Sequence, residues 1–113
     1  MYRISFYVPA ESAESVKEAL FTAGAGRLGD YDRCSWETSG TGQFRPFGGA
    51  RPAVGNVGNL ERLEEVKIEM ICGDSAVEAS LEALLKTHPY EEPAYAVWPV
   101  LTLGDFRSGA VSR

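Results

Sequence analysis

The chain has 113 residues, and eleven Lys and Arg against sixteen Asp and Glu give it a net charge of −5. This length fits one domain that can bury a core without disulfides or metal ions. The acidic balance argues against nucleic acid as a partner, because binding phosphates requires a basic surface. A histidine-rich metal site or a Ser-His-Asp triad would have to be built around one residue, His88.

Hydropathy and cysteine content predict a cytoplasmic protein. No apolar run approaches the ~20 residues that a membrane span needs, so we expect no membrane partner. The first residues also lack the apolar region of a secretory signal. Cys34 and Cys72 do not form a CxxC pair. In a reducing compartment we expect two small buried residues, with a zinc site or a redox pair as the alternatives.

The first third of the chain has a strand pattern followed by a helix pattern. Residues 2–8 alternate between apolar and polar, which predicts a half-buried strand. Residues 12–23 have helical spacing, with Ser12 as N-cap and Gly24 as a left-handed C-terminal residue. Three glycines over 24–29 follow a helix, whereas a phosphate loop precedes one. We therefore expect a tight connection there, with nucleotide binding as the alternative.

The middle of the chain predicts extended structure and a glycine-rich loop. A second strand is expected over 31–38, and a third over 40–47 pairs with it through a short turn. The stretch 40–59 is predicted to carry a glycine-rich loop, and it contains Arg45 and Arg51 but no acidic residue. This locally basic loop is either a site for an anion or a partner, or a solvated loop that lacks acids.

The last part of the chain predicts a strand, a helix and a final strand. Residues 61–72 alternate as a long strand, and a capping box at 75–78 predicts the start of a helix that runs to His88. Two prolines make 88–93 a stiff connector. Residues 95–103 form a final strand that is apolar on both faces.

These elements give the order β-α-β-β-α-β, an α+β ferredoxin-like fold with an antiparallel sheet and both helices on one face. We expect one domain over 1–103 and a polar, frayed tail over 104–113. Besides the final strand, Tyr7 and Ile71 point to the uncovered face of the sheet. Because a free face normally alternates cleanly, this apolar excess predicts that copies of the chain bury it in a homo-oligomer.

Three segments taken together, residues 23–35, 40–46 and 88–95, resemble the YqfO-type domain of the Nif-three-like family (NGG-one interacting factor three). In that family the domain is an insert between the two halves of a dinuclear-metal protein, and it also occurs as a stand-alone bacterial protein. The resemblance implies a fold like that of CutA and the PII signalling proteins. Those proteins are trimers of ferredoxin-like subunits packed sheet to sheet, so it also implies a trimer.

The resemblance restricts the expected function. The dinuclear metal centre of the full-length family lies in the flanking domain, so its suggested hydrolase-like activity is not carried over to this chain. What the resemblance implies is a non-enzymatic regulatory or binding module for a small anion or a partner protein. The alternatives are a CutA-like divalent-metal binder and a small enzyme that uses Cys34, His88 or the glutamates.

A ligand site is expected near the clefts between subunits. The segment 43–46 corresponds to the long binding loop of PII-type proteins, and Arg45 offers a fixed fork for carboxylate or phosphate. Glycines in the preceding residues would let a ligand approach the backbone. The candidate ligand-binding residues are Gly40, Gly42, Phe44, Arg45, Tyr31 and Tyr90.

A second candidate cluster surrounds the single histidine. Imidazole and carboxylates can bind a divalent cation, and the candidate ligands are His88, Glu91, Glu92 and Glu65. The alternative is structural: His88 caps the end of the helix and bonds a carboxylate. A third possibility is that His88 approaches Cys34 and activates it as a nucleophile.

Overall fold

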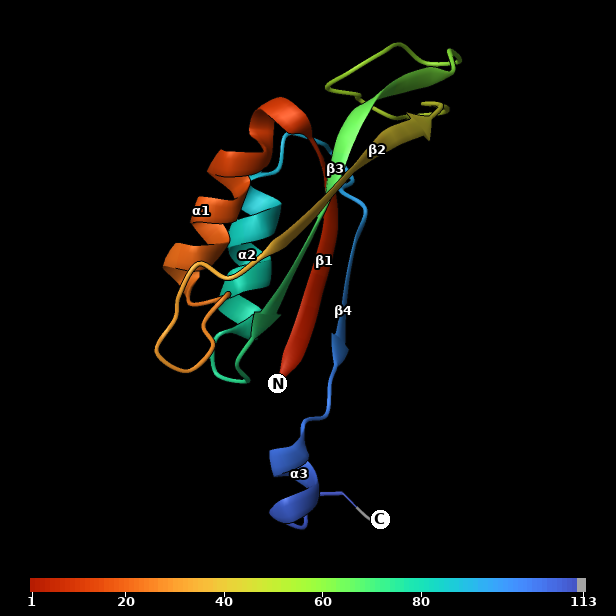
Figure 1. The fold of residues 1–113 in the computed structure, drawn as a ribbon. Coiled ribbons are helices and arrows are strands. Elements are labelled where there is room, and N and C mark those ends of the chain that lie inside the picture. Colours follow the sequence, from red (N-terminus) through yellow and green to blue (C-terminus); the bar gives the residue numbers. More distant parts are fainter. Residues whose placement is uncertain (112–113) are drawn as a thin grey trace.

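The computed structural model describes residues 1–111, and its elements follow the sequence periodicities closely (Figure 1). The strands form an antiparallel sheet in the order β2-β3-β1-β4. Two helices, α1 and α2, pack side by side on one face of it. The elements are β1 (Tyr2–Pro9), a 3-10 turn η1 (Ala10–Ser12), α1 (Ala13–Ala23), β2 (Trp36–Phe44), β3 (Glu61–Cys72), α2 (Val77–Thr87), β4 (Tyr95–Pro99) and α3 (Leu103–Arg107). The expected α+β, ferredoxin-like arrangement is confirmed.

The core lies between the helices and the two central strands. In the register of β1 and β3, Ile4 faces Met70 and Phe6 faces Ile68, so alternate residues of both strands point toward the helices. The helices contribute three fully buried apolar side chains, Val16, Leu20 and Leu84. Burying a side chain of this size stabilises the fold by ~1.5–3 kcal/mol. Apolar residues therefore recur at the positions that face the core, and these positions give the period-2 and helical patterns of the sequence.

The two strands predicted over 31–38 and 40–47 are wrong as separate elements, because they would give the chain five strands, whereas the order β-α-β-β-α-β has four. They form one strand, β2, which continues through Gly40 without a turn. It pairs along its whole length with β3, from Trp36 opposite Glu69 to Phe44 opposite Glu61. Because long cross-strand pairing holds the glycine in extended backbone, the loop begins only after Phe44. The glycine-rich loop is therefore shorter than the predicted stretch 40–59.

The helix ends agree only in part with the predicted caps. Gly24 ends α1 in the left-handed region, with φ 114°, as predicted. Ser12 is the N-cap of α1 but makes no side-chain capping bond. The capping box predicted at 75–78 is not formed, because α2 begins one residue later than that box requires, with Ala76 as its N-cap.

The C-terminal segment contains a helix that the polar composition did not predict. The Asp105 carboxylate accepts a hydrogen bond from the backbone N–H of Thr102 at 2.8 Å, which closes the first turn of α3. This bond holds the pKa of Asp105 below its ordinary value. The tail predicted over 104–113 ends with residues 112–113, which lie outside the described residues.

The glycine-rich connection after α1 is a tight backbone link to β3. Gly26 has φ 79° and donates its N–H to the carbonyl of Ile71 at 2.7 Å. Its own carbonyl accepts the N–H of Cys34 at 2.8 Å. A Cβ at Gly26 would lie 3.0 Å from the Cys34 carbonyl oxygen, so this position needs a glycine for both its φ and its space. Both cysteines are free thiols, and Cys72 is buried.

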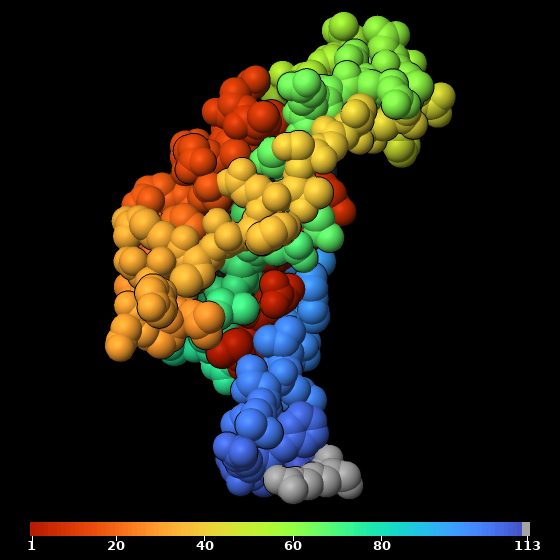
Figure 2. Space-filling view, in the orientation of Figure 1, coloured from red at the N-terminus to blue at the C-terminus, as the bar shows by residue number. Residues whose placement is uncertain are grey.

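The outer end of the hairpin formed by β2 and β3 projects beyond the helices, and α3 lies at the opposite end of the molecule (Figures 1 and 2). This arrangement gives the chain an elongated shape with extents of 52 × 28 × 23 Å. No helix of the described residues is long and apolar enough to cross a bilayer.

Candidate functional site

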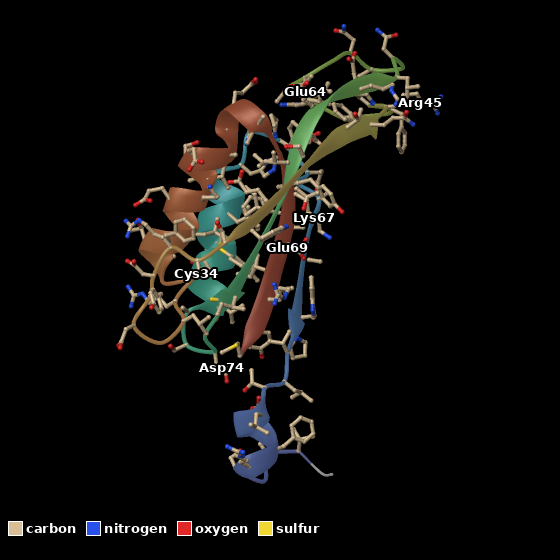
Figure 3. The ribbon with its side chains drawn as sticks, viewed as in Figure 1. Cys34, Arg45, Glu64, Lys67, Glu69 and Asp74 are labelled. Atoms are coloured by element: carbon tan, nitrogen blue, oxygen red, sulfur yellow. The ribbon has the colours of Figure 1, made fainter. Side chains whose placement is uncertain are left out.

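A cavity of about 750 Å³ opens at the projecting end of the sheet. The free face of β1 and β3 forms its floor, and the loop after β2 and the connector between α2 and β4 form its walls. Arg45 lies at the outer end of β2, where that loop begins (Figure 3). The lining residues are Tyr7, Gln43, Phe44, Arg45, Pro46, Phe47, Gly49, Ala50, Pro52, Ala53, Val54, Glu65, Tyr90, Glu91, Glu92 and Ala94.

The cavity brings together most residues of the two clusters that the sequence predicted separately. The predicted residues that line the cavity are Phe44, Arg45, Glu65, Tyr90, Glu91 and Glu92. Gly40 and Gly42 line an adjoining hollow of about 250 Å³, which shares Tyr7 and Glu65 with the cavity. Tyr31 lies in the connection after α1, 74% exposed, and lines neither space.

His88 does not line the cavity, but it bonds the backbone of two residues that do. The side chain is 7% exposed, and its Nε2 lies 2.7 Å from the carbonyl oxygen of Tyr7. Its Nδ1 accepts the backbone N–H of Tyr90 at 3.0 Å. Because a carbonyl can only accept, Nε2 must carry the proton, and the ring is the neutral tautomer. His88 therefore joins β1 to the connector, and it does not bond a carboxylate as the structural alternative supposed.

Burial sets the charge of this imidazole. The pKa of His88 is lowered from its ordinary value of 6.5, mainly because burial penalises the charged ring. The hydrogen bond to the Tyr7 carbonyl and the negative charge of Glu65 oppose this effect without overcoming it. The neutral ring is the form that keeps the bond from Tyr90.

Tyr90 and Glu65 continue the same network toward β2. The Tyr90 hydroxyl donates to Glu65 Oε2 at 2.7 Å, and burial together with this carboxylate raises the pKa of Tyr90 well above its ordinary value. The Glu65 side chain lies against Gly42, where a Cβ would meet Oε1 at 1.8 Å. Gly42 therefore makes room for a protein carboxylate, and not for the close approach of a ligand that its sequence position predicts.

Three of the four predicted metal ligands are already bonded to protein groups, and Glu92 is the exception. Both ring nitrogens of His88 have partners, Glu65 accepts from Tyr90, and Glu91 accepts the backbone N–H of Arg51 at 2.9 Å. Among residues 1–111, no group of three or more His, Cys, Asp or Glu side chains is placed to hold a metal ion. Metal binding stays a prediction.

Tyr7 lines the cavity but is not among the predicted site residues, although its position in the alternating strand predicts that it points to the uncovered face. The signal in the sequence is that Tyr7 is an aromatic residue on the polar side of an alternating strand. The same signal also predicts self-association, and that is the interpretation given above. The loop residues Pro52 to Val54 carried no signal beyond their loop composition. Cys34 lies in the connection after α1, away from Arg45 and the outer end of the hairpin (Figure 3).

No protein-family model matches the chain, but curated proteins and solved structures do. It is 46% identical over 95 residues to the GTP cyclohydrolase 1 type 2 homolog of Mycobacterium tuberculosis, and 44% identical over 98 residues to that of Bacillus subtilis. A Bacillus cereus protein related to NIF3 superposes with a TM-score of 0.74 at 41% identity over 88% of this chain. The resemblance to the NIF3-like family is confirmed. The chain spans about a quarter of the length of each of these relatives.

The fold is also that of CutA proteins. The chain superposes on Pyrococcus horikoshii CutA with a TM-score of 0.67, covering 96% of this chain and 93% of that one at 20% identity. The periplasmic divalent cation tolerance protein CutA of Archaeoglobus fulgidus gives a TM-score of 0.64 at 17% identity. These likenesses confirm the CutA-like fold of this NIF3-like chain.

Proposed function

We propose that this NIF3-like chain is a non-enzymatic binding or regulatory module that holds a small organic molecule, or a side chain of a partner protein, in the cavity beside Arg45. One observation supports the proposal above others. The loop after β2 and the connector before β4, which are far apart in the sequence, together enclose a space of about 750 Å³. That volume lies within the ~300–1,000 Å³ typical of small-molecule sites.

A non-enzymatic role is supported by how the reactive residues are used. His88 spends both ring nitrogens on backbone groups, so neither is free to activate a nucleophile. The thiol of Cys34 faces the carbonyl oxygen of Asp32 at 3.7 Å. The chain also spans about a quarter of the relatives' length, so the activity that their name suggests is not assigned to it.

A thermal-shift screen with nucleotides, carboxylic acids and divalent metal salts tests the proposal. A ligand at ~100 times its Kd stabilises the protein by ~2.7 kcal/mol. We expect a carboxylate-bearing compound to raise the Tm, and Arg45→Ala to abolish that rise, because the guanidinium supplies the positive charge of the lining.

Arg27→Ala is the matched control, because Arg27 is exposed in the connection after α1 and does not line the cavity. The proposal is contradicted if no compound shifts the Tm, or if both variants lose the response equally. A shift with a metal salt alone that His88→Ala removes would instead support the metal-binding alternative.

We further propose that the module self-associates through its sheet, as a trimer, so that the cavity lies near a cleft between subunits. Every residue of β4 is exposed, including Val97 on the helix side and Trp98 on the other side. Trp36, at the start of β2, is 69% exposed on the free face. Apolar side chains on both edges of a sheet suit burial against identical copies.

Size-exclusion chromatography with light scattering is expected to give three times the 12.3 kDa chain mass at micromolar concentration. Trp98→Lys should shift the mass toward the monomer, because it places a charge in the proposed interface. Leu85→Lys, at an exposed site on α2, serves as the control. A wild-type mass of one chain would refute self-association.

A further inference from the structure

Resting on the proposed function, we infer that the ligand of this cavity is amphoteric: an apolar or aromatic body with an acidic group for Arg45 and an ammonium group for Glu92. The two residues approach the cavity from opposite sides. Arg45 follows β2, at one edge of the sheet, and Glu92 precedes β4, at the other edge. A ligand that spans the cavity therefore meets a cation on one side and an anion on the other.

The walls between these charges suit an apolar body. Phe44 and Tyr90 pack with ring centroids 5.9 Å apart and planes tilted by 57°, which is a common aromatic pair geometry. Tyr7 stands on the floor, 43% exposed, and Phe47 at the rim is 76% exposed. A ligand that covers these surfaces removes apolar area from water, which favours its binding.

The charged groups of the lining differ in whether they already have partners. Glu65 accepts the Tyr90 hydroxyl, and Glu91 accepts a backbone N–H. Within the described part of the chain, Arg45 and Glu92 take part in no side-chain hydrogen bond or ion pair. Water satisfies both groups while the cavity is open. An occupant that displaces this water must replace it at both groups, because an unpaired charge is costly to desolvate.

A singly charged ligand leaves one of these groups without a partner. A carboxylate alone would satisfy Arg45 but would enter a lining that holds three glutamates against one arginine. An amine alone would leave the guanidinium unpaired. Lys67 lines the adjoining hollow and not the cavity, and it pairs with Glu69 at 3.9 Å. Only a ligand of both charges completes the site.

The inference is tested by titrating the full chain with three matched probes that share one ring. These are para-(aminomethyl)phenylacetate, with both charges, para-tolylacetate, with the acidic group alone, and para-methylbenzylamine, with the amine alone. We expect the amphoteric probe to bind at least ~10-fold more tightly than either of the others, since one added charge-assisted hydrogen bond contributes ~1.5–3 kcal/mol. Calorimetry or ligand-observed NMR gives the affinities.

Two substitutions assign the ends of the probe. Glu92→Gln should weaken the two amine-bearing probes and strengthen the binding of para-tolylacetate, because it removes the charge that this probe leaves unpaired. Arg45→Gln should weaken the two acids and strengthen the binding of the amine for the same reason. Glu82→Gln, on the exposed side of α2, is the control for loss of one negative charge. Equal affinity of the acid and the amphoteric probe, with no effect of Glu92→Gln, overturns the inference but keeps the cavity as an anion site. No binding by any probe overturns the amphoteric ligand, while the Arg45→Ala screen above decides the proposed function independently.

Discussion

Replacing His88 by alanine is expected to lower the free energy of unfolding by about 2–4 kcal/mol. The substitution leaves the carbonyl of Tyr7 and the backbone N–H of Tyr90 without their partner and creates a cavity beneath the connector. His88→Gln keeps a side chain that can donate and accept, so we expect it to recover part of the loss. Urea unfolding monitored by tryptophan fluorescence at about pH 7.5 gives the three values.

The same residue predicts a dependence on pH. Because the pKa of His88 is lower in the folded protein than its ordinary 6.5, the unfolded chain binds the proton more readily. This contribution to stability is complete above pH 6.5 and decreases as the pH falls through the folded-state pKa. The wild type should therefore lose more stability between about pH 7.5 and pH 5 than His88→Gln does. An equal loss in both proteins would show that other groups cause the dependence.

Gly42→Ala is expected to destabilise the fold by about 1–2 kcal/mol, whereas Gly40→Ala should be nearly neutral. A Cβ at Gly42 would force the Glu65 carboxylate away and remove the hydrogen bond from the Tyr90 hydroxyl. A Cβ at Gly40 meets no atom within 4 Å. The two glycines lie in the same strand, so the comparison separates the contact with Glu65 from the general effect of alanine on a strand.

A second measurement connects Gly42→Ala to the network. Burial and the bond to Glu65 raise the pKa of Tyr90, so the variant should titrate this hydroxyl at lower pH than the wild type. Ultraviolet difference spectra in alkali report that change. Equal stability and equal tyrosine titration in Gly40→Ala and Gly42→Ala would show that Glu65 can leave Gly42 without cost.

The fold was predictable because its core follows simple periods. In β1, Ile4, Phe6 and Val8 alternate as a strand requires, and all three are buried. The failure at β2 has an equally physical cause. Short strands are recognised by their apolar alternation, but every residue from Trp36 to Thr41 is exposed. A strand that buries so little, and that contains two glycines, has no pattern to separate it from a turn.

The site was predictable only as residue types. Phe44 and Arg45 belong to one predicted segment, and Tyr90 and Glu92 to another, because each segment has a distinctive composition. The two segments adjoin opposite edges of the sheet, β2 and β4. They border one cavity because its floor spans the two strands between those edges, β3 and β1. Distances of this kind, such as the 2.7 Å between Tyr90 and Glu65, depend on strand register, which composition does not specify.

The pairing of β1 with β4 places the first and the last residues of the sheet side by side. Tyr2 lies opposite Pro99, and the N–H of Val100 donates to the carbonyl of Met1 at 3.0 Å, so the chain enters and leaves the sheet at one point (Figure 1). Such a domain can be spliced into a host loop without separating the two halves of the host. The cavity lies at the far end of the same strands. The cavity and the two ends of the sheet are therefore joined by β1 and β4.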